Sequence, residues 1–210
     1  MALGLPQFSN CYTYIQRGVT ASPTVEQTRH NVGSTVDQSE YPALLGICIL
    51  TEQQYNTPYT LTRVPIPSIR RNELLIRIHA AGFCHSDLQV LQGEVNSPLP
   101  MIPSHEPAGV VVQVGEDAGQ WKIGDRVGVL NFKGACSQCP DCISTQRRYG
   151  AVDARFCRHR ETAGFQHDGA FAEYLVADAA TTVALPDSMS FEQAAPLLCA
   201  GVSLSPSEVG

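Results

Sequence analysis

The sequence lacks the long apolar runs, the basic blocks and the charged leader that would mark three common classes of protein. Its longest apolar run, residues 43–50, is far shorter than the about 20 residues that cross a bilayer, so we expect no membrane span. No run of Lys or Arg could neutralise a row of phosphates, and the 210-residue chain has a net charge of −6, so we expect no nucleic-acid partner. No charged segment leads into an apolar one near the N-terminus, which argues against a secretory signal.

Residues 1–42 are also poor in apolar periodicity, and Ser, Thr, Gln and Asn are scattered through them. Such a segment cannot bury enough apolar surface to fold, so we expect a disordered extension. Arg17 and Arg29, with few acidic residues nearby, leave a mitochondrial presequence as the alternative. The predicted location is therefore cytoplasmic, with mitochondrial as the alternative.

Cysteine, in contrast, is plentiful, with eight residues. An even number would favour disulfides in a small secreted protein, but this chain is not small and carries no secretory signal. Three cysteines lie close together in "CSQCPDC", and CxxCxxC spacing in a reducing compartment favours a metal site over disulfides. The full set is Cys11, Cys48, Cys84, Cys136, Cys139, Cys142, Cys157 and Cys199.

From about residue 45 the pattern is that of short strands bounded by Gly and Pro. "NELLIRIHAAG" places Leu74, Ile76 and Ile78 on one face, the period of two that is typical of a strand. This pattern predicts a mainly β fold, a small barrel or sandwich. The other runs that predict strands are "LGICILT", "YTLTRVPIP", "AGVVVQVG", "GDRVGVL" and "AFAEYLVADAATTVAL".

The last part of the sequence predicts a helix. Ser190 followed three residues later by Gln193 is a capping-box pattern, so a helix should begin there and carry Cys199. It should end near Gly201, because Pro206 makes the residue before it a poor helical residue.

The CxxCxxC motif favours a closed zinc site. Two-residue gaps let neighbouring thiolates converge on one ion at about 2.3 Å from each sulfur, and a fourth thiolate completes a tetrahedron. Cys157 is the obvious fourth ligand, after the polar loop at residues 143–156. Separate buried or redox thiols are the weaker alternative. A nucleic-acid-binding zinc ribbon is disfavoured by the acidic charge balance.

The remaining candidate ligands are scattered along the chain. A catalytic zinc needs three protein ligands and an open position, and two thiolates with one imidazole would serve. Spacing alone leaves this open, because a lone histidine such as His105 is more often satisfied or on the surface. Cys199 could equally fill an apolar helix face. These candidates are Cys84, His85, His105, Glu106 and Cys199.

Taken together and in order, several segments resemble the GroES-like catalytic domain of the zinc-dependent medium-chain alcohol dehydrogenases, in a form common in fungi. The resemblance covers about residues 45–203 and leaves 204–210 as a divergent tail. It implies a GroES-like β-barrel with short helices and a structural-zinc lobe. The segments are "NELLIRIHAAGFCHSDL", "IPSHEPAGVVVQVG", "WKIGDRVG", "CSQCPDC", "HDGAFAEYLVADAATTVALPD" and "AAPLLCAGV".

The resemblance also implies two zinc sites. Cys84, His105 and Cys199 stand where the family holds its catalytic zinc. The positions of the structural zinc are occupied by Cys136, Cys139, Cys142 and Cys157.

Four further residues match family positions next to the catalytic zinc. Ser86 matches the hydroxyl residue that passes the alcohol proton away from the metal, and Asp87 matches the carboxylate that orients the ligating histidine. Glu106 matches an acid that exchanges with zinc-bound water. His85 matches a position near the cofactor phosphates.

The implied activity is oxidation of a small-molecule alcohol to an aldehyde or ketone, with zinc (Zn) and NAD or NADP as cofactors. No GxGxxG occurs in the sequence, which leaves the family pattern after Val202, so we expect no Rossmann cofactor domain here. We therefore expect the chain alone to bind zinc without oxidising alcohols at a useful rate. The alternative is a non-catalytic zinc-binding fragment or pseudoenzyme that acts as an interaction module. For partners we expect a small-molecule alcohol, and either a homo-oligomer or an association with full-length relatives.

Overall fold

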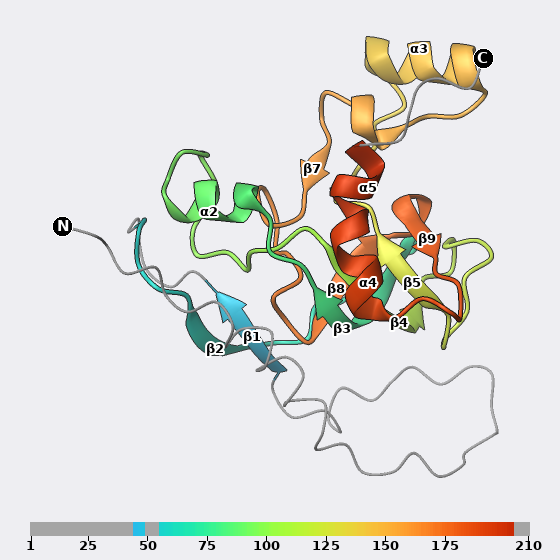
Figure 1. Cartoon of the computed structure of the whole chain (residues 1–210). Coiled ribbons are helices and arrows are strands. Elements are labelled where there is room, and N and C mark those ends of the chain that lie inside the picture. Colours follow the sequence, from blue (N-terminus) through green and yellow to red (C-terminus); the bar gives the residue numbers. More distant parts are fainter. Residues whose placement is uncertain (1–43, 49–54, 204–210) are drawn as a thin grey trace, which may run out of the picture.

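The computed structural model describes residues 44–48 and 55–203 (Figure 1). The predictions of a disordered extension at 1–42 and of a divergent tail at 204–210 lie outside these residues. The strands are β1 (Leu44–Cys48), β2 (Thr60–Val64), β3 (Glu73–Ala81), β4 (Pro107–Val114), β5 (Arg126–Val129), β6 (Phe132–Lys133), β7 (Glu161–Thr162), β8 (Tyr174–Asp178) and β9 (Thr182–Ala184). The helical segments are α2 (His85–Leu91), α3 (Pro140–Tyr149), η2 (Ala154–Phe156), η3 (Ala179–Thr181), α4 (Phe191–Ala194), η4 (Ala195–Leu198) and α5 (Ala200–Ser203).

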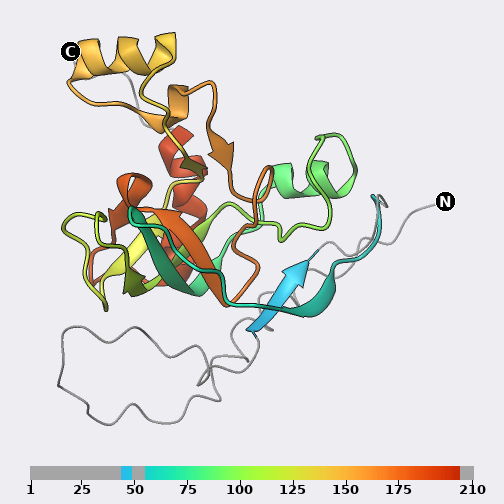
Figure 2. The same cartoon turned by 180° about the vertical axis from the view of Figure 1, so that it is seen from behind.

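The main sheet has five strands in the order β8-β3-β4-β5-β9, and every neighbouring pair is antiparallel. Two smaller antiparallel pairs, β1 with β2 and β6 with β7, extend from it (Figures 1 and 2). Each run that the sequence analysis assigned to strands overlaps at least one of these strands. The prediction of a mainly β fold is confirmed.

The alternation of side chains along β3 places its large apolar residues in the core. Leu74, Ile76 and Ile78 are all buried in the largest apolar cluster, as predicted. Strand β4 comes very close to β3, because a side-chain carbon added at Gly109 would lie 2.1 Å from the Arg77 carbonyl oxygen. The other buried members of the cluster are Ala81, Ile102, Val111, Ala118, Val127, Val129, Ala170, Phe171, Leu175 and Ala177.

The C-terminal helical segment begins where predicted but is not one helix. The Ser190 Oγ accepts a hydrogen bond from the Gln193 N–H at 3.2 Å, and the Gln193 Oε1 accepts one from the Ser190 N–H at 3.1 Å. The helix then narrows into η4, because Pro196 has no N–H to continue the α-helical ladder. The prediction of a continuous helix is therefore wrong, and Cys199 lies at the junction between η4 and α5.

The interface of this segment with the sheet is partly aromatic. The Phe191 ring stacks on the His79 ring with centroids 4.7 Å apart, and the Arg126 guanidinium lies 4.1 Å from the Phe191 centroid. Arg126 also donates a hydrogen bond to the Met189 carbonyl. These contacts hold the start of α4 against β3 and β5, and so determine where Cys199 lies.

The segment before Cys157 is a second correction. We predicted a polar loop, but its first half belongs to α3, which begins at Pro140 and ends before Gly150, and its end is the short helix η2. Proline suits the first helical position, and Gly150 has the left-handed conformation that favours glycine after a helix, with φ of 74°. Helix α3 projects away from the main sheet in both views (Figures 1 and 2). In the part of the chain that the structure describes, no helix has the length and apolar character of a bilayer-crossing segment.

The core assignment can be tested by truncating a fully buried side chain. Ile76 is 0% exposed, so Ile76→Ala should lower the free energy of unfolding by about 2–5 kcal/mol. The matched control is Ile123→Ala, because Ile123 is 69% exposed and its loss should cost about 0.5 kcal/mol or less. Urea unfolding followed by fluorescence of the single tryptophan measures both. Equal effects of the two substitutions would contradict the assignment.

Candidate metal centres

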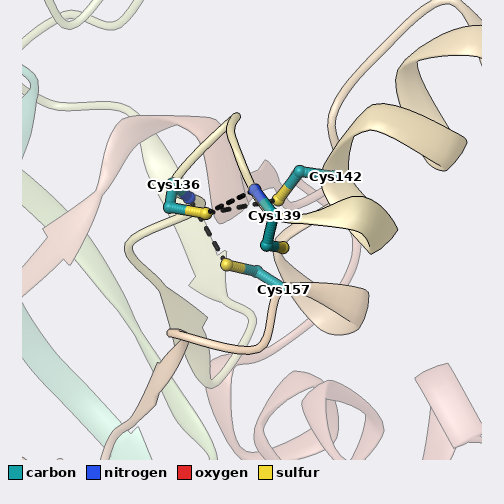
Figure 3. A group of neighbouring side chains, drawn as sticks. All are labelled: Cys136, Cys139, Cys142 and Cys157. Atoms are coloured by element: carbon teal, nitrogen blue, oxygen red, sulfur yellow. Dashed lines mark hydrogen bonds between the residues drawn. The ribbon is translucent and has the colours of Figure 1, made fainter.

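The first cluster of metal-binding side chains contains only cysteines. Four sulfur atoms lie within 4.8 Å of one another, and three of the four residues are buried (Figure 3). Two come from the turn after β6, one from the first turn of α3 and one from the end of η2. All four are free thiols, so disulfides do not account for the cluster. Its members are Cys136, Cys139, Cys142 and Cys157.

The spacing of these sulfur atoms suits a tetrahedral ion. The Sγ atoms of Cys136 and Cys142 are 3.9 Å apart, and a tetrahedron with metal–sulfur bonds of about 2.3 Å has edges of about 3.8 Å. Backbone N–H groups also point at the sulfurs, from Cys139 to Cys136 at 3.3 Å and from His159 to Cys157 at 3.3 Å. Such donors stabilise thiolates, which are the form that binds metal.

The charges in this cluster need a cation. Hydrogen bonds from the backbone N–H groups of Arg158 and Cys142 lower the pKa of Cys139 to about 6. Burial and the neighbouring thiols raise the pKa of Cys142 to about 12. Without a cation, several thiolates cannot share this space. A buried, all-sulfur, tetrahedral donor set is the kind that zinc prefers, so the residues fit the predicted ion.

The second cluster joins residues that are far apart in the sequence. One donor atom from each of Cys84, His105, Glu106 and Cys199 lies within 4.8 Å of the others. Cys84 follows β3 and precedes α2, and His105 and Glu106 lie directly before β4. Cys199 comes from the junction of η4 and α5. The fold therefore brings the three predicted catalytic ligands together and adds a carboxylate to them.

The Asp87 carboxylate holds two of these segments in place. One of its oxygens accepts the Cys84 N–H at 2.9 Å, and the other accepts the Ser104 N–H at 3.0 Å. The second oxygen also lies 3.3 Å from the His105 Nδ1. Asp87 is 0% exposed, so these protein donors take the place of water around its carboxylate. With Nδ1 directed at Asp87, Nε2 is the ring nitrogen that remains for a metal.

The turn before His105 has an unusual backbone. Ser104 has a φ of 79°, although it is not glycine. Its hydroxyl donates to the Gly82 carbonyl at 2.9 Å, and the turn is packed tightly against Gly169, where an added side-chain carbon would lie 2.0 Å from the Ser104 carbonyl oxygen. Strained conformations of this kind persist only where the surroundings enforce them, often at functional sites. Nothing local in the sequence signals the role of Ser104.

The acidic groups of the second cluster also affect one another's ionisation. Burial and the nearby Cys84 raise the pKa of Cys199 to about 12. Burial likewise raises the pKa of the Glu106 carboxyl. Burial opposes ionisation of Cys84, but hydrogen bonds from Ser86 and His105 offset it and lower the pKa of this thiol. Two thiols and an imidazole match a three-ligand zinc site, so this set also fits the predicted ion.

The remaining predicted residues lie around the cluster. The Ser86 Oγ is 3.6 Å from the Cys84 Sγ, and the Ser86 side chain is half-buried. His85 is exposed at the first position of α2 and is not among the clustered donors. Its contact with a cofactor therefore stays a prediction.

Comparison with known proteins gives a family and a set of relatives. The family described as the alcohol dehydrogenase GroES-like domain matches residues 70–187. An alcohol dehydrogenase of Geobacillus stearothermophilus is 40% identical over 153 residues, which are 72% of this chain and 43% of that protein. The chain therefore spans less than half the length of this relative.

Several solved structures have a fold similar to that of this chain. CAD from Helicobacter pylori, complexed with NADP(H), is 28% identical with a TM-score of 0.64, over 76% of this chain and 46% of that chain. A thermostable alcohol dehydrogenase from Pyrobaculum aerophilum, with cobalt and zinc bound, is 27% identical with a TM-score of 0.61, over 75% of this chain and 45% of that chain. These matches confirm the GroES-like fold that the sequence resemblance implied.

The central role of Asp87 predicts the effect of Asp87→Asn. An amide has one acceptor oxygen, so at least one buried donor would lose its partner, at about 1–3 kcal/mol of stability. Zinc affinity should fall about 10–100-fold, as for other carboxylates that orient a ligating histidine. Competition with a chelator of known affinity measures this. Asp117→Asn, at an exposed ion pair with Arg71, is the control and should leave affinity unchanged. Equal zinc affinity in both variants would refute the role.

The four-cysteine cluster predicts a structural zinc. Cys139→Ser should remove about one zinc per chain and strongly lower stability, because binding energy at a structural zinc is folding energy. Cys84→Ala, in the other cluster, is the reciprocal control and should lower stability less. Elemental analysis and thermal unfolding measure both effects. If Cys139→Ser kept its metal and its stability, the site would not exist.

Proposed function

Since the chain belongs to the zinc-dependent medium-chain alcohol dehydrogenase family, we propose that its GroES-like domain binds a catalytic zinc and holds an alcohol for oxidation to an aldehyde or ketone. The observation that carries this proposal is the second cluster. It combines two thiols, an imidazole and a carboxylate, drawn from three separate segments of the chain, with a hydroxyl beside them. A purely structural site would not need the carboxylate or the hydroxyl.

The proposed ligands are Cys84, His105 and Cys199. Asp87 fixes the His105 ring so that Nε2 is free to bind the ion, and it fixes the Cys84 backbone at the same time. Bound zinc would supply a Lewis acid, which lowers the pKa of an alcohol hydroxyl.

Ser86 is the proposed proton acceptor for the alcohol. Its hydroxyl lies 3.6 Å from the Cys84 Sγ, so an alcohol held beside Cys84 would lie within reach of it. A hydroxyl can accept one proton in a hydrogen bond while it donates its own, so it can move a proton toward water without holding a charge. Because Ser86 is only half-buried, such a path can lead to solvent.

The proposed hydride acceptor is NAD or NADP. The support for this is the family and the bound NADP(H) of the Helicobacter pylori relative. His85, exposed beside the cluster, is the candidate contact for its phosphates. The cofactor supplies the redox chemistry, and the residues described here would bind and orient the alcohol.

Cobalt substitution gives a test that does not depend on turnover. We expect the wild-type chain to bind two cobalt ions with thiolate absorption bands, and Cys84→Ala to lose the bands of one site only. Trifluoroethanol, an alcohol that resists oxidation, should shift the bands of that site. Cys139→Ser is the matched variant, and its remaining site should still respond.

Two results would count against the proposal. Identical cobalt spectra of the wild type and Cys84→Ala would show that the catalytic site does not bind metal. Cobalt bands that depend on Cys84 but do not shift when an alcohol is added would instead favour the alternative of a non-catalytic zinc-binding module.

A further inference from the structure

The space beside Gly82 is filled by the side chain of Glu106. A side-chain carbon added at Gly82 would lie 1.8 Å from the Glu106 Oε2, 2.9 Å from Cδ and 3.0 Å from Cβ. All three nearest atoms thus belong to one side chain. The φ of Gly82 is not positive, so its backbone conformation does not itself demand glycine. What excludes a larger residue here is the position of Glu106.

The backbone at Gly82 cannot easily move away from this contact. Its N–H donates to the Glu106 carbonyl at 3.1 Å, and its carbonyl accepts the Ser104 hydroxyl at 2.9 Å. Ser104 is itself bound to the buried Asp87. An added methyl group would therefore be accommodated by movement of the flexible end of Glu106, its carboxylate.

The Glu106 carboxylate is the acidic member of the second metal cluster. The residue is 5% exposed, and a carboxylate oxygen lies within 4.8 Å of the donor atoms of Cys84, His105 and Cys199. Displacing the carboxylate means taking it away from these donors.

We infer that Gly82 is a positioning residue: the absence of a side chain there leaves the space in which the Glu106 carboxylate lies beside the three proposed zinc ligands. The inference rests on the proposed function of this site. It assigns to Gly82 a role in the metal chemistry, through Glu106, in place of a role in ending β3.

The inference makes the two residues interdependent. Gly82→Ala should push the carboxylate away from the metal, and Glu106→Ala should remove it, so both variants should alter the same metal site in the same way. When Glu106→Ala has removed the carboxylate, the methyl group added by Gly82→Ala no longer meets it. Only the Glu106 Cβ remains close, at 3.0 Å, which a shift of a few tenths of an ångström would relieve. The effects should therefore be strongly non-additive.

Gly109→Ala is the matched control. It is the same substitution in the neighbouring strand, but there the added carbon would meet the Arg77 carbonyl oxygen at 2.1 Å. That atom is backbone, and truncation of Glu106 cannot relieve the contact. Gly109→Ala should destabilise the protein equally with and without Glu106.

The experiment compares Gly82→Ala, Glu106→Ala, Gly109→Ala and the two double variants made with Glu106→Ala. The first readout is the absorption of cobalt in the Cys84 site and the rate at which a chelator removes it. The second is the urea midpoint of the metal-free chains. We expect Gly82→Ala and Glu106→Ala to shift the bands alike and to change the removal rate about tenfold or more. The double variant should match Glu106→Ala, and the urea midpoint lost in Gly82→Ala should be largely regained.

A purely structural role for Gly82 gives a different result. Gly82→Ala would then cost the same in both backgrounds, as Gly109→Ala does, and the inference would be overturned. Unchanged bands in Gly82→Ala would overturn it too. If Gly82→Ala fails to fold, folding of the double variant supports the inference and failure of both refutes it. Absence of any Cys84-dependent band in the wild type defeats the proposed function itself, whereas a normal band with no rescue defeats only this inference.

Discussion

One buried carboxylate, that of Asp87, fixes the geometry on which the second metal cluster depends. A charge with no solvent exposure is tolerated only when it is fully hydrogen-bonded, and here the donors come from two segments that are not adjacent in the sequence. Satisfying Asp87 therefore requires the start of α2 and the turn at Ser104 to lie side by side. The same contacts set the ring orientation of His105. The contacts that Asp87 needs in order to be buried are thus the same contacts that place the proposed ligands Cys84 and His105.

The sequence predicted those features that local periodicity encodes. Leu74, Ile76 and Ile78 are buried because a strand alternates its faces, and the capping box at Ser190 begins a helix because its donors and acceptors are three residues apart. The two errors concern residues whose signals were present. Pro196 interrupts the helix, and Pro140 with Gly150 bounds α3, which we had predicted as a loop. At Pro196 the missing N–H outweighed an apolar helical pattern, whereas Pro140 and Gly150 bound a helix within a polar segment.

The sites were predictable to different degrees for a physical reason. The four-cysteine cluster is mostly local, so its spacing alone indicates a tetrahedral ion. Cys84, His105 and Cys199 meet only through tertiary structure, and only the family resemblance singled them out. The contact of Gly82 with Glu106 and the positive φ of Ser104 have no local signature at all. They result from strands and turns that pack together, which a single sequence does not reveal.

The two clusters differ in how much chain each must gather. Cys136 and Cys157 are 21 residues apart, whereas the other cluster reaches from Cys84 to Cys199. The entropy lost when a flexible chain closes on itself grows with the logarithm of its length, so the longer closure costs about 1.5 kcal/mol more. During refolding with metal, the four-cysteine cluster can therefore bind its ion while the main sheet is still forming. The second ion can bind only after η4 has packed against the sheet and brought Cys199 into place. With cobalt, the absorption bands of the two sites would therefore appear one after the other.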